Sequence, residues 1–180
     1  GIESFESMAR LVPWERSTPL CNFLHWGLQA AGMRLIHAGT LARDGVGVMV
    51  VGASGAGKSG TVLAGILGGL DSTGDDYVAI NLTPEAVMSA PVVRVMKQDR
   101  TGLQRLGLDP DDGFGPSSWR NKHEFDFERL GAGRRARKIK LVGIVLPKIA
   151  RAESTGFVPA LSRTAAMAMT PCAQVQAAIS

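Results

Sequence analysis

The spacing of apolar positions predicts helices and strands in alternation along most of the chain. Apolar residues recur at helical spacing over residues 18–32, where Thr18 and Pro19 are typical of a helix start and Gly32 of a helix end. Two more helices are predicted over residues 59–67 and 160–169. Short runs rich in aliphatic and β-branched residues predict strands at 34–38, 47–51, 77–81, 92–96 and 139–146. This mixture indicates an α/β domain.

Turn residues predict how these elements are connected. Residues 43–45, Arg-Asp-Gly, predict a turn that would join the strands at 34–38 and 47–51 into a hairpin-like pair. Residues 101–116 contain Asp-Pro-Asp-Asp-Gly and are predicted to form a surface loop. Residues 1–16 and 150–180 show no clear organisation and are treated as peripheral. Because no linker divides the chain, we expect a single domain over residues 1–180.

Composition narrows the class of protein. With 180 residues, 45% of them hydrophobic, and a net charge of +4, the chain is expected to be one folded domain rather than a disordered one. No apolar stretch approaches the roughly 20 residues that cross a bilayer, so no membrane span is expected. The two cysteines, Cys21 and Cys172, form no zinc-binding spacing and no disulfide framework, which favours a cytoplasmic protein.

The strongest motif is a glycine-rich loop. Residues 52–59 match G-x-x-x-x-G-K-[ST] between a predicted strand and a predicted helix, which is the context that a phosphate-binding loop requires. Backbone N–H groups of such a loop surround phosphate, the lysine reaches the β- and γ-phosphates, and the serine hydroxyl binds Mg²⁺. The residues predicted to bind a nucleotide are Gly52, Ala53, Ser54, Gly55, Ala56, Gly57, Lys58, Ser59 and Gly60.

A pair of carboxylates follows this loop. Asp75 and Asp76 come directly after Gly74 and immediately before the predicted strand at residues 77–81. Two adjacent carboxylates at the end of a strand can divide two tasks, since one can hold a metal ion while the other accepts a proton from an attacking hydroxyl. The alternative is a solvated turn, because aspartate is common in turns.

These motifs together resemble the catalytic domain of HPr kinase/phosphorylase, and phosphoenolpyruvate carboxykinase is similar in its nucleotide-binding core. The pattern is still more similar to HPr-kinase-like proteins of bacterial peptide-modification clusters, including kinases of lasso-peptide precursors. The resemblance spans roughly residues 20–150 and rests on the glycine-rich loop, on residues 74–76, and on His37 ahead of the loop. It implies a P-loop nucleotide-binding domain with a mixed sheet and flanking helices.

The resemblance also implies roles for individual residues. Asp75 would be the acid/base that acts on a seryl hydroxyl and Asp76 a Mg²⁺ partner, although the reverse assignment is open. His37 would lie near the phosphates together with Lys58. Lys97 and Lys122 match positions where the family has a basic residue, and they are candidate cations for the phosphate or the substrate. For both lysines, an ordinary solvated surface charge is the alternative.

The resulting expectation is an ATP- and Mg²⁺-dependent kinase that transfers the γ-phosphoryl group to a serine of a peptide or small protein, with a lasso-type precursor as one candidate. Two alternatives stay open: a small-molecule kinase with the same site, and a nucleotide-binding regulatory protein with little transfer activity. HPr kinases assemble as hexamers, so by analogy the resemblance leaves open that this protein also forms a homo-oligomer.

A basic run at residues 134–140 contains five cations in seven positions. It is interpreted either as a docking surface for an acidic partner or as an ordinary solvated loop. The run has no interleaved aromatic residue and matches no nucleic-acid-binding motif, so no nucleic-acid partner is expected.

Overall fold

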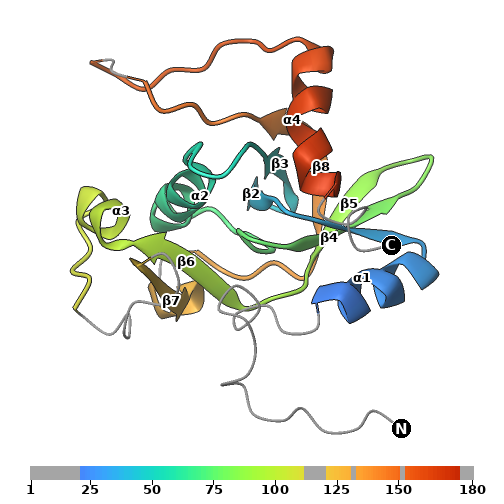
Figure 1. Ribbon diagram of the computed structural model, residues 1–180, viewed down its shortest axis with the longest axis horizontal. Coiled ribbons are helices and arrows are strands. Elements are labelled where there is room, and N and C mark those ends of the chain that lie inside the picture. Colours follow the sequence, from blue (N-terminus) through green and yellow to red (C-terminus); the bar gives the residue numbers. More distant parts are fainter. Residues whose placement is uncertain (1–20, 112–120, 131–132, 151–152, 175–180) are drawn as a thin grey trace, which may run out of the picture.

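The computed structural model describes residues 21–111, 121–130, 133–150 and 153–174 (Figure 1). Helices and strands alternate along these residues, as an α/β chain predicts. In chain order they are α1 (Cys21–Ala30), β1 (Met33–Ile36), β2 (Gly39–Arg43), β3 (Val46–Val50), α2 (Lys58–Leu67), β4 (Val78–Leu82), β5 (Val87–Pro91), β6 (Val95–Asp99), α3 (Arg100–Arg105), β7 (Lys122–Asp126), a 3-10 turn (Phe127–Leu130), β8 (Ile139–Val145) and α4 (Ser162–Gln174).

Six of the strands form one mixed sheet in the order β1-β4-β5-β8-β3-β2, and β6 and β7 form a separate two-stranded sheet. Neighbours in the large sheet are antiparallel, except that β3 and β8 are parallel. The sheet is therefore mostly antiparallel with flanking helices. Its parallel pair lies directly beside the connection from β3 to α2 (Figure 1).

Two apolar clusters cover the two faces of the large sheet. On one face, α2, α3 and the β6–β7 sheet pack around Val50, Leu63 and Met96. On the other face, Cys172 of α4 packs with Met49 and Val78 of the sheet. Successive residues of β3, Met49 and Val50, thus belong to different clusters, because neighbouring side chains in a strand point to opposite faces of the sheet. The strand that precedes the glycine-rich loop is held from both sides.

The turn of the predicted hairpin is present, but the strand that pairs with β3 is not the predicted one. The turn at Asp44 and Gly45 joins β3 to β2, and the first predicted strand, now β1, pairs with β4 instead. Both turn residues have positive φ angles, 52° and 78°, as a two-residue hairpin turn prefers. Strand β2 was not predicted, because its residues Gly39 and Ala42 have low β propensity.

The region after β4 also differs from the prediction. Of the strand expected at 92–96, only residues 95 and 96 are in a strand, because β5 ends at Pro91 and β6 begins at Val95. Strand β7 was not predicted. The surface loop expected at 101–116 begins instead with the short helix α3, which Asp99 caps through a 2.7 Å hydrogen bond from the Gly102 N–H. Six residues containing a glycine are too few for helical periodicity to be seen. Residues 112–116 of that expected loop lie outside the described part of the chain.

Close packing explains a glycine in α2 that helix propensity disfavours. A Cβ atom at Gly65 would lie 2.5 Å from Leu41 Cδ2, whereas one at Gly60 would contact only Gln98 Nε2, at 3.4 Å. We expect Gly65→Ala to lower the free energy of unfolding by about 1–2 kcal/mol, because overpacking outweighs the gain of about 1 kcal/mol in helix propensity. Urea unfolding checks this, with Gly60→Ala as the matched control in the same helix. A Gly65→Ala protein at least as stable as Gly60→Ala would contradict the packing argument.

Candidate functional site

The glycine-rich loop, residues 52–59, begins just after the buried end of β3 and runs into the first turn of α2. Gly57 is the residue before the helix and has a φ of 99°, and Gly55 has a φ of 83°, both in the left-handed region that favours glycine. The loop is thereby turned so that it leads directly into the N-terminus of a ten-residue helix. A helix N-terminus with free N–H groups is suited to bind an anion.

Lys58 is held against this loop. Its Nζ donates hydrogen bonds to the backbone oxygens of Gly52, at 2.7 Å, and Ala53, at 3.3 Å. The residue is only 7% exposed, and this burial lowers its pKa from the usual value for lysine. The ammonium group therefore lies at the loop, where phosphate would bind, rather than in solvent.

A network of buried hydroxyl groups fixes the segment that leads to the carboxylate pair. The Thr40 N–H donates to the Gly74 carbonyl at 3.0 Å, and Ser72 Oγ contacts both the N–H and the carbonyl of Gly74. Thr73 Oγ1 bonds to Thr40 Oγ1 and to Ser89 Oγ, at 2.8 and 2.7 Å. These threonines and serines lie on separate strands and connections, so the sheet itself positions residues 74–76.

Gly39 permits this close approach. A Cβ atom there would lie 2.5 Å from Val62 Cγ2 of α2 and 3.3 Å from the Asp75 Cα. At Gly39 there is therefore no room for a side chain. The start of β2 lies directly against α2 and against residues 74–76 there.

Asp75 is the most unusual side chain of the site. It is 2% exposed, and neither carboxylate oxygen has a partner with hydrogen-bond geometry among the described residues. Burial, and after it the charge of Asp76, raise the pKa of Asp75 to about 7. The nearby Ser59 hydroxyl and the two lysines at positions 97 and 122 act in the opposite direction and do not outweigh burial. Such a carboxyl group is ready to exchange a proton near neutral pH.

Asp76 has the opposite environment. Its Oδ1 lies 3.1 Å from His37 Nε2, and its Oδ2 accepts a hydrogen bond from Lys97 Nζ at 2.7 Å. Burial alone would raise its pKa, but the bond to His37 and the charge of Lys97 lower it below the usual range. The His37 ring in turn lies against the Tyr77 ring, with centroids 5.3 Å apart. Asp76 is thus held ionised and oriented beside a carboxyl group whose pKa lies near neutrality.

A cleft of about 900 Å³ unites these groups. It is lined by residues 54–61, His37, Asp75, Asp76, Lys97 and Lys122, so it brings together most of the residues predicted from the sequence. Gly52 and Ala53 do not line it, although their carbonyls hold Lys58. Lys97 contacts Asp76 directly, a pairing that the sequence did not predict. The cleft also contains Gln98, Gly102 and Arg105, which no sequence motif indicated.

The donors available to a metal ion are oxygens. Among the residues that the structure describes, no group of three or more His, Cys, Asp and Glu side chains forms a metal-binding cluster. The Ser59 hydroxyl and the carboxylates of Asp75 and Asp76, which all line the cleft, fit a hard cation that takes its other ligands from phosphate and water. Each Asp76 oxygen contacts one partner, His37 or Lys97, and keeps a further lone pair that a metal ion can use.

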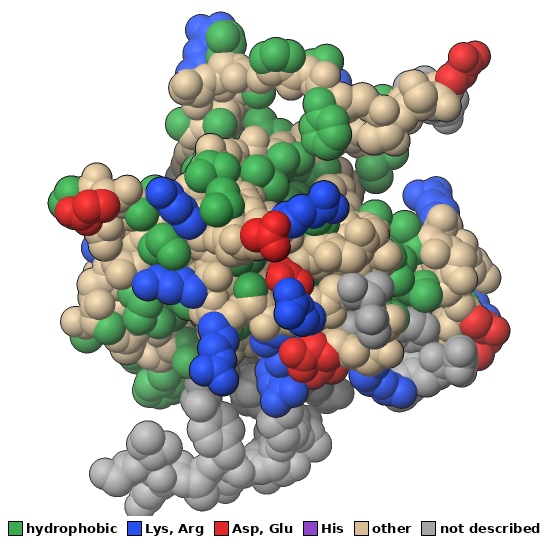
Figure 2. All heavy atoms as spheres, turned by 180° about the vertical axis from the view of Figure 1, so that it is seen from behind, with side chains coloured by type: hydrophobic (Ala, Val, Ile, Leu, Met, Phe, Trp, Pro, Cys, Tyr) green, Lys and Arg blue, Asp and Glu red, His purple; other side chains and the backbone are tan. Residues whose placement is uncertain are grey.

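Two cations of the basic run are tied to the fold. Arg135 lies 2.7 Å from Asp126, with a side chain 13% exposed, and Arg134 lies 3.5 Å from Asp71. The backbone of Arg134 also pairs with Ser72, next to the carboxylate segment. Arg135 therefore braces the connection to β8, whereas the Arg134 side chain is 86% exposed and its ion pair lies at the surface. Figure 2 shows acidic and basic side chains intermixed across the middle of the face opposite to that of Figure 1.

Comparison with known proteins adds a structural likeness. No protein-family model matches the chain. No curated protein matches its sequence. A solved structure of the HPr(Ser) kinase/phosphatase from Coxiella burnetii is similar with a TM-score of 0.43 and 17% identity, over 70% of this chain and 71% of that chain. None of the described helices has both the length and the apolar character needed to cross a bilayer.

Proposed function

We propose that the protein is a kinase that uses ATP and Mg²⁺ to phosphorylate a hydroxyl group, with a seryl side chain of a peptide or small protein as acceptor. The observation that supports this most directly is Asp75, a buried carboxyl without a hydrogen-bond partner among the described residues, in the same cleft as the glycine-rich loop. An acid/base group beside an anion-binding helix terminus is the arrangement that transfer of a phosphoryl group to a hydroxyl requires.

In the proposed reaction, the Asp75 carboxylate accepts the proton of the acceptor hydroxyl while that oxygen attacks the γ-phosphorus. A bond forms between the acceptor oxygen and phosphorus, the bond from phosphorus to the β–γ bridging oxygen breaks, and ADP leaves with the electron pair. Lys58 and the N–H groups of the loop stabilise the charge on the transferred group. Mg²⁺ would supply charge neutralisation at the β- and γ-phosphates, held by Ser59 and Asp76.

The seryl acceptor and the possible lasso-type precursor are supported by the motif resemblance of residues 52–59 and 74–76. A small-molecule kinase would have the same donor site, and a regulatory protein would bind the nucleotide without fast transfer. Incubation with γ-labelled ATP, Mg²⁺, candidate precursor peptides and a small-metabolite mixture separates the three. Labelled peptide supports the proposal, labelled metabolite favours the second function, and nucleotide binding without any labelled product favours the third.

Lys58→Ala should weaken ATP binding by roughly 10- to 100-fold, because charged hydrogen bonds to phosphate contribute about 1.5–3 kcal/mol. Isothermal titration calorimetry with ATP and Mg²⁺ measures this. Lys138→Ala, which removes an exposed cation outside the cleft, is the matched control and should bind as the unaltered protein does. Equal affinities for the two variants would show that the loop does not hold phosphate.

A further inference from the structure

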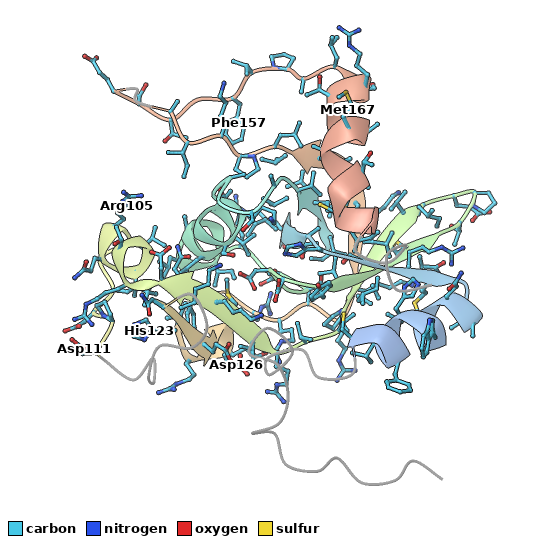
Figure 3. All side chains as sticks on the ribbon, in the orientation of Figure 1. Arg105, Asp111, His123, Asp126, Phe157 and Met167 are labelled. Atoms are coloured by element: carbon cyan, nitrogen blue, oxygen red, sulfur yellow. The ribbon has the colours of Figure 1, made fainter. Side chains whose placement is uncertain are left out.

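One part of the cleft is not used by the phosphate chemistry. It is a slot between α2 and α3, lined by Gly60, Thr61 and Ala64 on one side and by Gly102 and Leu106 on the other. Arg105 is exposed at the end of α3, and Figure 3 shows it on the side of that helix opposite to His123. The slot therefore has the small residues Gly60, Ala64 and Gly102 among its walls and a cation at its outer end.

Gln98 lies at the base of this slot, between two glycines. A Cβ atom at Gly60 would be 3.4 Å from Gln98 Nε2, and one at Gly102 would collide with the Gln98 carboxamide, its Cδ being only 2.5 Å away. The side chain is thus confined between the first turn of α2 and the first turn of α3. Gly102 is small because Gln98 occupies the space beside it.

The Gln98 carboxamide lines the cleft and forms no hydrogen bond with another described residue. The residue as a whole is 8% exposed. A carboxamide carries two donors and an acceptor, and a buried one is normally satisfied. Since Gln98 lines the cleft, its carboxamide is available to a ligand there.

We propose that Gln98 recognises the nucleoside part of the nucleotide by hydrogen bonding. This inference rests on the proposed function, since it takes the triphosphate to lie at the glycine-rich loop. Gly60 follows Ser59 directly, so the slot begins where the phosphate chain leaves the helix N-terminus. The nucleoside is the part of the ligand that must continue from there.

The chemistry of the slot favours a nucleoside over a further phosphate. Gln98 is neutral, and phosphate recognition typically uses cations or backbone N–H groups. A carboxamide matches a partner that both donates and accepts, as the adenine edge does through its amino group and ring nitrogen and as a ribose hydroxyl does. A cleft of about 900 Å³ is also ample for a whole nucleotide, since small-molecule sites span roughly 300–1,000 Å³.

The test compares Gln98→Met with the unaltered protein. Methionine keeps the length of the side chain between the two glycines but removes its donors and acceptor. Gln104→Met, on an exposed position of α3 outside the cleft, is the matched control. Affinities for ATP, GTP, 2′-deoxy-ATP and inorganic tripolyphosphate, all with Mg²⁺, are measured by calorimetry.

Gln98→Met should weaken ATP binding by about 5- to 100-fold and leave tripolyphosphate binding within about twofold, while Gln104→Met changes neither. Loss of an ATP preference over GTP would assign the contact to the base, and loss of a preference over 2′-deoxy-ATP would assign it to the ribose; both support the inference. Unchanged ATP affinity, or equal losses for ATP and tripolyphosphate, would overturn it. If the unaltered protein bound no tripolyphosphate and no nucleotide, the proposed function itself would fail.

Discussion

Asp75→Asn should reduce phosphoryl transfer by about 10²- to 10⁴-fold, the range that general acid–base catalysis contributes. Asparagine has nearly the shape of aspartate but cannot accept the proton of the acceptor hydroxyl. Because the loop and Lys58 are unchanged, the affinity for ATP should stay within about threefold of that of the unaltered protein. Single-turnover transfer from γ-labelled ATP measures the first quantity, and calorimetry measures the second.

Asp111→Asn is the matched control for this prediction. Asp111 is an exposed aspartate paired with Arg100 at 2.6 Å, outside the cleft, and its replacement should leave transfer unchanged. Transfer by Asp75→Asn at more than a tenth of the normal rate would exclude Asp75 as the base. The role would then pass to another group, and the proposed reaction would be wrong in its central step.

The unaltered protein should lose stability between pH 5 and pH 8 relative to Asp75→Asn, by about 2–3 kcal/mol. The pKa of Asp75 is about 7 in the folded state, against roughly 3.9 for an unperturbed aspartate in an unfolded chain. Over that interval the folded state binds the extra proton, so the free energy of unfolding falls as the pH rises through 7. Asparagine does not titrate and lacks this contribution.

Urea unfolding without nucleotide or Mg²⁺, at pH 5 and at pH 8, measures the difference between the two proteins. Asp76 does not obscure it, because its lowered pKa keeps it ionised throughout this interval. Asp111→Asn should follow the pH dependence of the unaltered protein. Parallel profiles for the unaltered protein and Asp75→Asn would show that Asp75 titrates as an ordinary aspartate.

Features encoded by contiguous residues could be predicted from the sequence. The glycine-rich loop lies between β3 and α2 as expected, because glycines at positions 55 and 57 are needed for left-handed backbone and the flanking apolar runs define a strand and a helix. Strand β8, expected at 139–146, spans Ile139–Val145. The helix expected at 160–169 is present as the longer α4. The helix expected at 18–32 is described only from Cys21 to Ala30, and its predicted start lies outside the described residues.

Pairings between distant residues could not be predicted in this way. The sequence placed Asp75 and Asp76 side by side, but it did not show that one is buried without a partner while the other is held by His37 and Lys97. Lys97 was expected near phosphate, and in the structure it contacts Asp76 from 21 positions along the chain. Likewise, β1 pairs with β4 rather than β3 because sheet neighbours are chosen by packing over the whole domain.

The sequence by itself determined the anion-binding loop and the presence of two carboxylates, since local backbone geometry and side-chain chemistry depend on adjacent residues. The tertiary structure alone decided which carboxyl group has a pKa near neutrality, because packing buries Asp75 and brings His37 and Lys97 to Asp76. It also decided that Gln98 opens into the cleft between Gly60 and Gly102, three residues that only the packing of α2, β6 and α3 brings together.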